Sequence, residues 1–177
     1  MRPTPLLDRL LFHLARRRRA SGEGQGVLLV AAGGLGDTVL LMAVLERFLP
    51  LAGKGEQVTL LLRQDAAKMG FLVPPEVEIL SVDFKRLGRE TDYRLWIFQT
   101  LAGRGFRLAV SLDYLRHPHL DEALIRAAFA QESLAMRAKP WDKHQKALDA
   151  NQSQFTRLYD SGPALSVAYQ RRTWPVY

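Results

Sequence analysis

The residues that most constrain the fold of this chain are 27–48, VLLVAAGGLGDTVLLMAVLERF. Residues 27–32 are apolar without alternation, which is typical of a central strand in a parallel sheet, buried on both faces. Gly33, Gly34 and Gly36 follow, and apolar residues then recur with the period of a helix. The stretch therefore predicts a strand, a glycine-rich turn and a helix, in that order.

The glycine-rich turn predicts a place where a ligand meets the main chain. Glycine permits backbone angles that a Cβ atom forbids, and it lets a ligand approach closely. The helix that follows presents free N–H groups and the positive end of its dipole, which favour an anion or a cluster of hydroxyls. Asp37 lies in the first turn of this helix. It is either an ordinary helix-start carboxylate or a group that faces the ligand.

The rest of the chain alternates between strand and helix patterns with short connections, which is typical of βαβ units. Further strands are expected at 58–62, 77–82, 106–112 and 133–137, with a weak one within 162–177. Helices are expected at 64–71, 92–102 and 120–130 and as a long pattern over 141–159, and a loop at 83–91. The fold class predicted is α/β, a doubly wound, mostly parallel Rossmann-like sheet. Its ligand crevice lies beyond the carboxyl ends of the strands, where Asp37 and Asp113 should both lie because each follows a strand end.

Three segments are expected: a basic amphipathic N-terminal segment at 1–25, one lobe at 26–160, and a tail or the start of an interdomain linker at 161–177. The first segment places five leucines on one helical stripe and follows them with four consecutive arginines. The leucines are Leu6, Leu7, Leu10, Leu11 and Leu14. This order of charges is wrong for a secretory signal, and the apolar run is too short to span a bilayer. Two interpretations remain: a helix lying on an anionic membrane surface, or a helix packed on the domain.

Composition excludes several classes of protein. The 177 residues suffice for one domain with a sizeable core. The absence of cysteine excludes disulfides and thiolate chemistry, and it suits a reducing cytoplasm. The net charge of +7 is concentrated near the N-terminus, with six arginines against two acidic residues in the first 26. A basic face interleaved with aromatics is not seen, so we expect no nucleic-acid partner.

Three stretches resemble the family 9 glycosyltransferases, the heptosyltransferases of lipopolysaccharide core assembly. GGLGDTVLLMAVLERF is similar to the family's first motif, and FRLAVSLD, ending at Asp113, is similar to its fourth-strand segment. His144, in the string KHQ, and Asn151 resemble the region where the family's first lobe ends. The resemblance covers residues 26–159. It departs from the family at Ala31 and Ala32, where members often have a basic residue.

The resemblance implies the N-terminal, acceptor-side lobe of a GT-B enzyme that transfers heptose, with inversion, from ADP-heptose to a lipopolysaccharide core acceptor. It implies Asp37 as general base, with contacts to the acceptor from six further residues: Gly33, Gly34, Gly36, Thr38, Asp113 and His117. No metal or resident cofactor is expected, because the nucleotide-sugar donor, an ADP-sugar, belongs to the second lobe of such enzymes.

The resemblance also implies partners and a location. The expected partners are a lipid-linked saccharide acceptor and a chain that supplies the donor lobe. An anionic membrane surface is a further partner if the N-terminal helix lies on it. The expected location is the cytoplasm, with peripheral attachment to the inner membrane. Because the chain ends about where the first lobe of the family ends, we expect it to fold, to bind ADP-sugar weakly if at all, and to show no transfer alone.

Other readings of the same residues stay open. One is a non-catalytic or vestigial sugar-binding domain. The other is an NADP-binding oxidoreductase domain, although the third glycine of a dinucleotide motif is missing and Arg63, rather than an acidic residue, ends the second strand.

The string DYLRHPHLD could supply metal ligands from His117, His119 and nearby carboxylates, or it could form a polar loop facing the acceptor. Trp96 and Phe98 are expected in the core rather than as a platform for a sugar. The arginines between residues 86 and 107 are expected mostly on the surface, in solvent, and one or two of them could face acceptor phosphates.

Overall fold

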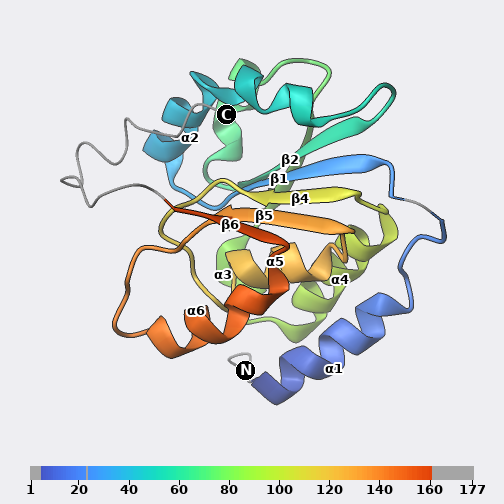
Figure 1. Ribbon diagram of the computed structural model, residues 1–177, viewed down its shortest axis with the longest axis vertical. Helices are drawn as coiled ribbons and strands as arrows, with labels where there is room; N and C mark the ends of the chain where they lie inside the picture. The colour runs from blue at the N-terminus through green and yellow to red at the C-terminus, as the bar shows by residue number, and fades with distance from the viewer. Residues whose placement is uncertain (1–4, 23, 161–177) are drawn as a thin grey trace.

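The computed structural model describes residues 5–22 and 24–160 and contains a six-stranded, all-parallel sheet (Figure 1). The strand order is β3-β2-β1-β4-β5-β6. The strands are β1 Gly26–Ala31, β2 Gln57–Arg63, β3 Glu78–Val82, β4 Leu108–Ser111, β5 Glu132–Met136 and β6 Arg157–Tyr159. This arrangement confirms the predicted doubly wound α/β fold.

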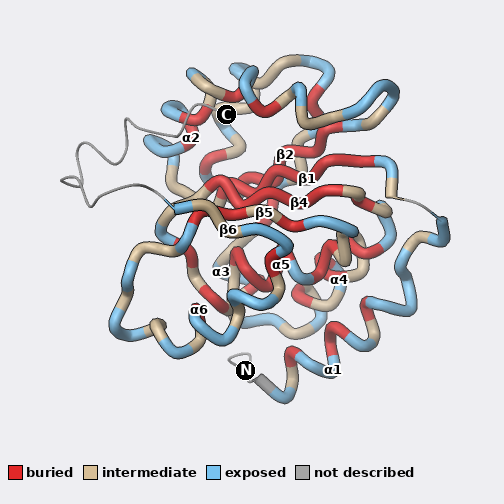
Figure 2. The backbone as a smooth tube through the Cα atoms, viewed as in Figure 1, coloured by how far each residue is buried: buried red, intermediate tan, exposed pale blue. Residues whose placement is uncertain are grey.

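The sheet is the middle of three layers (Figure 1). One face carries five α-helices, namely α1 Pro5–Arg16, α3 Phe84–Leu87, α4 Thr91–Gly103, α5 Asp121–Ala127 and α6 Gln145–Asn151. The other face carries α2 Leu35–Met42 and three short 3₁₀ turns, at Leu45–Arg47, Leu49–Leu51 and Ala67–Leu72. All six residues of β1 are buried, and alternate side chains enter the two cores: Leu28 and Val30 face the side of α4 and α5, and Val27 and Leu29 face the side of α2. Figure 2 shows this buried central layer.

Helix α1 packs on the domain with a face that only partly coincides with the predicted leucine stripe. Its buried residues are Asp8, Leu11, Phe12 and Ala15, and Leu7 and Leu14 are partly buried, whereas Leu6 is 77% exposed and Leu10 is 54% exposed. The packed face is rotated from the stripe because buried partners on α4 decide which side turns inward. Phe12 stacks on Phe98 of α4 with ring centroids 4.8 Å apart. No helix within residues 5–22 and 24–160 is long and apolar enough to cross a membrane.

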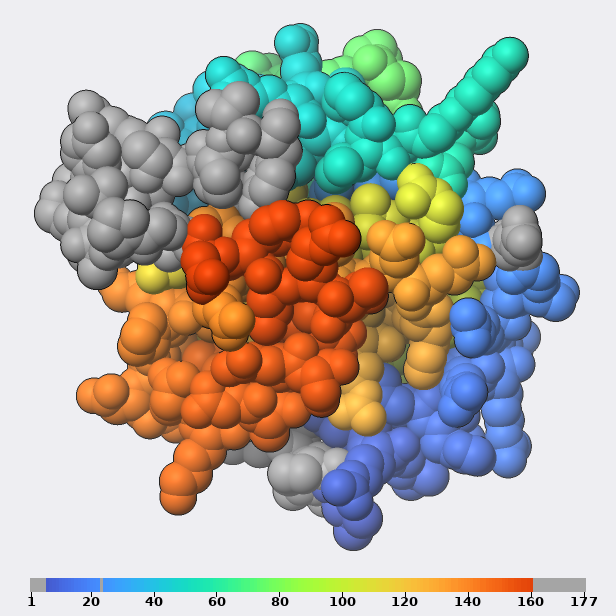
Figure 3. Space-filling model, viewed as in Figure 1, coloured from blue at the N-terminus to red at the C-terminus, as the bar shows by residue number. Residues whose placement is uncertain are grey.

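The long helix predicted at 141–159 is wrong. The structure places α6, the 3₁₀ turn Gln152–Gln154 and β6 there. Phe155 is buried in the core, and the N–H of Thr156 donates to the carbonyl of Ser133, which begins the pairing of β6 with β5. Much of the face seen in Figure 3 belongs to these C-terminal elements. The polar pattern read as helix therefore hides a sixth strand at the sheet edge, and the predicted strand within 162–177 lies outside the described residues.

Three shorter predictions also need correction. The expected loop at 83–91 contains α3, because Asp83 Oδ1 caps it by accepting the N–H groups of Lys85 and Arg86 at 2.8 and 3.0 Å. The helix after the glycine turn ends at Met42 rather than at Phe48, and the chain continues in 3₁₀ turns. The helix expected at 64–71 is likewise a 3₁₀ turn.

Candidate functional site

The candidate site lies where the strand order reverses, at the carboxyl ends of β1 and β4. Strands β1 and β4 are neighbours, and their connections lead away in opposite directions, which is the place where open α/β sheets bind ligands. The N–H of Ala32, just after β1, donates to Oδ2 of Asp113, just after β4, at 2.5 Å. This bond ties the glycine turn to the end of β4.

The glycine turn is shaped by close packing rather than by unusual backbone angles. None of Gly33, Gly34 and Gly36 has a positive φ, so the expectation of angles forbidden to other residues is wrong. At Gly33 a Cβ atom would lie 2.6 Å from the Cβ of Asp37, so the missing side chain makes room for the first turn of α2. At Gly36 a Cβ atom would have nothing within 4 Å. The main chain at Gly36 is therefore open to an approaching ligand.

Asp37 is exposed at the start of α2. Its Oδ2 accepts the N–H of Gly34, the N-cap residue, at 3.0 Å. Thr38, by contrast, is buried, and its Oγ1 donates to the carbonyl of Gly34 at 3.1 Å. The Asp37 carboxylate is thus accessible as well as helix-capping, whereas the Thr38 hydroxyl serves the turn itself.

The carboxyl of Asp113 is partly buried beside Asp37. Burial and, to a smaller extent, the negative charge of Asp37 raise the pKa of Asp113 to about 6. The N–H groups of Ala32 and Gly33 and the guanidinium of Arg116 act in the opposite direction. Asp113 is therefore a second carboxyl in the crevice, and it can hold a proton in mildly acidic solution.

A buried ion pair fixes the loop after β4, which runs through residues 113–120. Arg116 Nε lies 2.9 Å from Oε1 of Glu122, and both side chains are buried. The guanidinium also donates to the carbonyl of Met136 and lies over the ring of Phe155, 5.0 Å from its centroid. Asn151 donates to Oε2 of Glu122 at 2.8 Å. The loop is therefore anchored by α5, β5 and the segment that leads into β6.

The two histidines of the loop are held near a third, His144. The ring centroid of His117 lies 4.5 Å from that of His144, and Nδ1 of His117 accepts the N–H of His119 at 3.2 Å. Burial, together with the positive potential of His144, lowers the pKa of His117 to about 4. His117 is thus neutral near pH 7, with Nδ1 already occupied as an acceptor.

Asp121 is buried, and it accepts the N–H of His117 at 2.8 Å. Burial and, to a smaller extent, the charge of Asp113 raise the pKa of Asp121 to about 7. Within residues 5–22 and 24–160, no group of three or more His, Cys, Asp or Glu side chains is arranged to hold a metal ion. The string DYLRHPHLD therefore forms a self-bonded polar loop in the described part of the chain.

Two assignments of surface and core from the sequence are wrong. Arg94 is buried rather than solvated: it makes a bidentate pair with Asp8 at 2.8 and 3.0 Å and donates to the carbonyl of His119 at 2.8 Å. Trp96 is 55% exposed, although Phe98 is buried as expected. The sequence signal that was overlooked is the pair Tyr93 and Trp96, spaced to share one face of α4.

Arg63, considered above as a contact to a 2′-phosphate, makes two bonds to Asp65 at 3.1 and 2.9 Å. Farther along the same edge, α2 and the turn at Ala67–Leu72 leave several apolar side chains exposed: Leu35, Val39, Leu40, Phe71 and Leu72. Together these side chains form the α2 apolar surface.

Comparison of the chain with protein-family models, with curated proteins and with solved structures found no match in any of the three.

Proposed function

We propose that this chain is the acceptor-side lobe of an inverting, family 9-like glycosyltransferase that moves heptose from ADP-heptose to a lipid-linked lipopolysaccharide core acceptor. A second lobe, carried by another chain or segment, would bind the ADP-sugar. The observation that carries the proposal is the exposed carboxylate of Asp37, which lies at the β1–β4 switch point beside an open glycine turn and a second carboxyl, Asp113.

In this proposal Asp37 is the general base. Its carboxylate takes the proton of the acceptor hydroxyl while that oxygen bonds to the anomeric carbon, and the bond from this carbon to the nucleotide diphosphate breaks. Asp37 suits the role because its side chain is exposed and only one of its carboxylate oxygens bonds a described residue. Gly34 and Gly36 let the acceptor approach the main chain, and Asp113 and His117 contact other hydroxyls.

The α2 apolar surface supports the need for a second lobe. Leu35 and Leu40 are both about half exposed on the helix that begins at the crevice. Exposed apolar groups of this kind mark surfaces that another domain or chain covers. Holding donor and acceptor together can supply roughly 7–11 kcal/mol of barrier reduction, so the isolated lobe should show no transfer.

The test is Asp37→Asn, assayed with the partner that supplies the donor lobe. Transfer should fall by about 10²–10⁴-fold with little change in the melting temperature, because a general base is lost while the fold is kept. Glu46→Gln, at another exposed carboxylate in the same connection, is the matched control and should keep full activity. Full activity of Asp37→Asn would reduce Asp37 to a helix-capping residue.

One observation favours a second candidate, the NADP-binding domain. The strand order β3-β2-β1-β4-β5-β6 is also that of dinucleotide-binding sheets. Against it, Asp37 would place a negative charge where the pyrophosphate sits, and Arg63 is already paired with Asp65.

A thermal-shift screen separates the candidates: stabilisation by a core oligosaccharide but not by NADPH supports the transferase lobe. Stabilisation by NADPH alone would replace it, and saccharide binding without transfer in the presence of the donor lobe would indicate the vestigial domain.

We also propose that the outer face of α1 attaches the protein to an anionic membrane in the cytoplasm. Leu6, Leu10 and the arginines Arg16–Arg19 are all exposed, and each basic residue near such a surface adds about 1 kcal/mol. The protein should float with phosphatidylglycerol vesicles, and less so in high salt. Leu6→Ser/Leu10→Ser should weaken flotation without unfolding. Deletion of α1 is a poor test, since it would leave Arg94 without Asp8. Equal flotation of the variant would contradict the attachment.

A further inference from the structure

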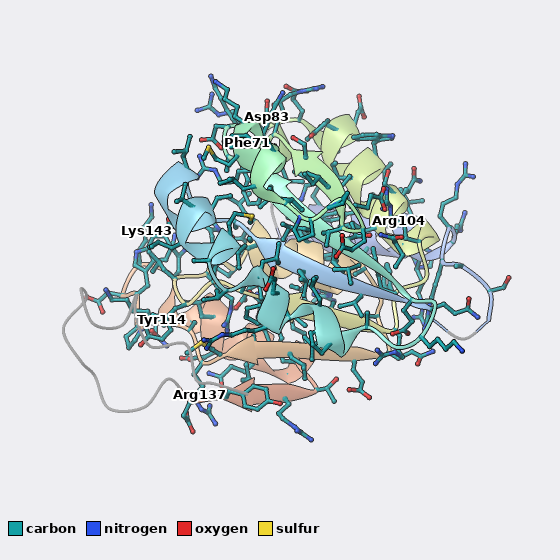
Figure 4. All side chains as sticks on the ribbon, turned by 90° about the horizontal axis from the view of Figure 1, so that it is seen from above. Phe71, Asp83, Arg104, Tyr114, Arg137 and Lys143 are labelled. Carbon is teal, nitrogen blue, oxygen red and sulfur yellow. The ribbon has the colours of Figure 1, made fainter. Side chains whose placement is uncertain are left out.

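A hollow of about 600 Å³ opens beside the carboxyl ends of β2 and β3, and it shares no residue with the glycine turn or with the loop after β4. It lies on the side of the molecule where Figure 4 labels Asp83. Its lining combines two aromatic rings with polar side chains from five different elements or connections. These residues are Gln64, Ser81, Asp83, Arg86, Asp92, Tyr93 and Trp96.

One aromatic ring of the hollow is largely exposed to solvent. Trp96 is 55% exposed, although the next two residues of α4, Ile97 and Phe98, are fully buried. Leaving so large a ring in water forgoes the stabilisation that burial would bring. The ring of Tyr93 lies 5.7 Å from Trp96 and is already engaged: its hydroxyl accepts the N–H of Asp83 at 2.9 Å, and the guanidinium of Arg86 lies 4.3 Å from its centroid.

Polar groups with unused hydrogen-bonding capacity surround this ring. The side chains of Gln64, Ser81 and Asp92 form no hydrogen bond or ion pair with any described residue. They supply an amide, a hydroxyl and a carboxylate, and therefore both donors and acceptors. Asp83, by contrast, uses Oδ1 to cap α3.

The charge of the lining narrows the class of ligand. Asp83 and Asp92 contribute two carboxylates, and the single cation, Arg86, is paired with Glu90 at 2.9 Å. A phosphate or a nucleotide would meet net negative charge here. An organic cation would need several free aromatic faces, but Arg86 already covers Tyr93. The lining fits a neutral ligand that has one apolar face and a rim of hydroxyls.

We propose that this hollow is a binding site for a neutral sugar ring of the pyranose type. The C–H face of the sugar packs on Trp96, because the electron-rich face of an indole attracts partially positive C–H groups. The hydroxyls of the sugar bond to Asp92, Gln64 and Ser81. This site goes beyond the proposed transferase function, since it requires neither Asp37 nor a donor lobe.

Saturation-transfer NMR on the full chain tests the site, with methyl α-D-mannopyranoside and methyl α-D-glucopyranoside as probes. A shallow site of this kind is expected to bind with Kd on the order of 1 mM. Trp96→Ala should abolish the saturation transfer, and Asp92→Asn should weaken binding about tenfold. Leu115→Ala is the matched control: Leu115 is 56% exposed, lies outside the hollow, and its replacement should leave binding unchanged.

Three results would overturn the site: no transfer to either methyl glycoside, equal transfer in Trp96→Ala, or tighter binding of glucose 6-phosphate or tetramethylammonium than of the neutral sugars. A melting curve of Trp96→Ala close to that of the native protein makes a loss of binding interpretable. Because no glycosyl transfer is measured, failure here leaves the role proposed for Asp37 untouched, and an inactive Asp37 variant leaves the hollow untouched.

Discussion

Two loops leave the sheet at the β1–β4 switch point, and different forces hold them. The glycine turn after β1 is kept in place by local contacts: Asp37 and Thr38 both bond to Gly34, and Gly33 makes room for Asp37. The loop after β4 is fixed by a buried ion pair and by hydrogen bonds from distant parts of the chain. Its ion pair Arg116–Glu122 is buried, and Arg94 and Asn151 donate to the carbonyls of His119 and Pro118.

The comparison indicates that the two loops have different roles in the crevice. The glycine turn is shallow and exposed, so its groups are free to meet a ligand. The loop after β4 forms a wall of the crevice, and its Asp113, His117 and His119 are partly withdrawn from water. Changes in the wall should therefore affect stability, and changes in the turn should affect ligand chemistry more than stability.

The largest effect is expected from breaking the buried pair in the wall. Glu122→Gln leaves the charge of Arg116 uncompensated and should lower the free energy of unfolding by about 3–5 kcal/mol. The double variant Arg116→Met/Glu122→Gln removes both charges and should be less destabilised than the sum of the single variants. Urea denaturation measures all three. A loss below about 1 kcal/mol for Glu122→Gln would show that the wall does not depend on this pair.

The next effect concerns Asp113 and pH. The native state holds the Asp113 proton more tightly than the unfolded chain, because the pKa is raised to about 6. The stability that this proton contributes is fully present below about pH 4 and is lost as the pH rises through 6. Asp113→Asn should therefore be more stable than the native protein at pH 8, by up to about 3 kcal/mol, and the difference should shrink toward pH 4.

Comparing the variant with the native protein at each pH is necessary because other groups near Asp113 also titrate. His117, with its pKa lowered to about 4, contributes stability that is present above about pH 6.5 and is lost as the pH falls toward 4. The charge of Asp113 raises the pKa of Asp121, so loss of that charge lowers the pKa of Asp121. This change also stabilises Asp113→Asn relative to the native protein at high pH. A difference between variant and native protein that does not change with pH would contradict the raised pKa of Asp113.

A smaller effect should distinguish two glycines within the turn. Gly33→Ala places a Cβ atom 2.6 Å from the Cβ of Asp37 and should cost about 1–3 kcal/mol. Gly36→Ala, in the first turn of α2, meets nothing within 4 Å and should be neutral or stabilising by up to about 1 kcal/mol. Thermal unfolding of both variants is the measurement. If Gly36→Ala is stable but no longer binds the acceptor, the open main chain there is a ligand contact.

The smallest effect on stability is expected at Asp37 itself. Asp37→Ala removes one hydrogen bond at an exposed helix start and should cost about 0.5–1 kcal/mol. If calorimetry shows a loss of stability as large as that of Glu122→Gln, the proposal that the glycine turn contributes little to stability is wrong. A small loss of stability combined with a large loss of transfer would support the assignment of ligand chemistry to the turn.

The sequence by itself determined the centre of the fold. The unbroken apolar run of β1, the glycine turn and the helix that follows are local patterns, and the strands β2 to β5 lie within two residues of their predicted places. Parallel pairing follows from the alternation of strands and helices, which also places Asp37 and Asp113 at one edge. The predicted end of the helix after the glycine turn was wrong because its apolar pattern continues into the 3₁₀ turns that follow Met42. The helix predicted at 141–159 was wrong because a weak local pattern cannot show that β5 pairs with residues Thr156 and Arg157.

Only the tertiary structure decided which charges and rings are buried. Arg94 was expected on the surface, but both Arg94 and Arg116 are buried, because each bonds a carboxylate and at least one carbonyl oxygen in the interior. Trp96 looks like a core residue, but it is 55% exposed and lines the hollow. Burial depends on partners that lie far away in the chain, as Asp8 lies 86 residues from Arg94, and no local pattern encodes those partners.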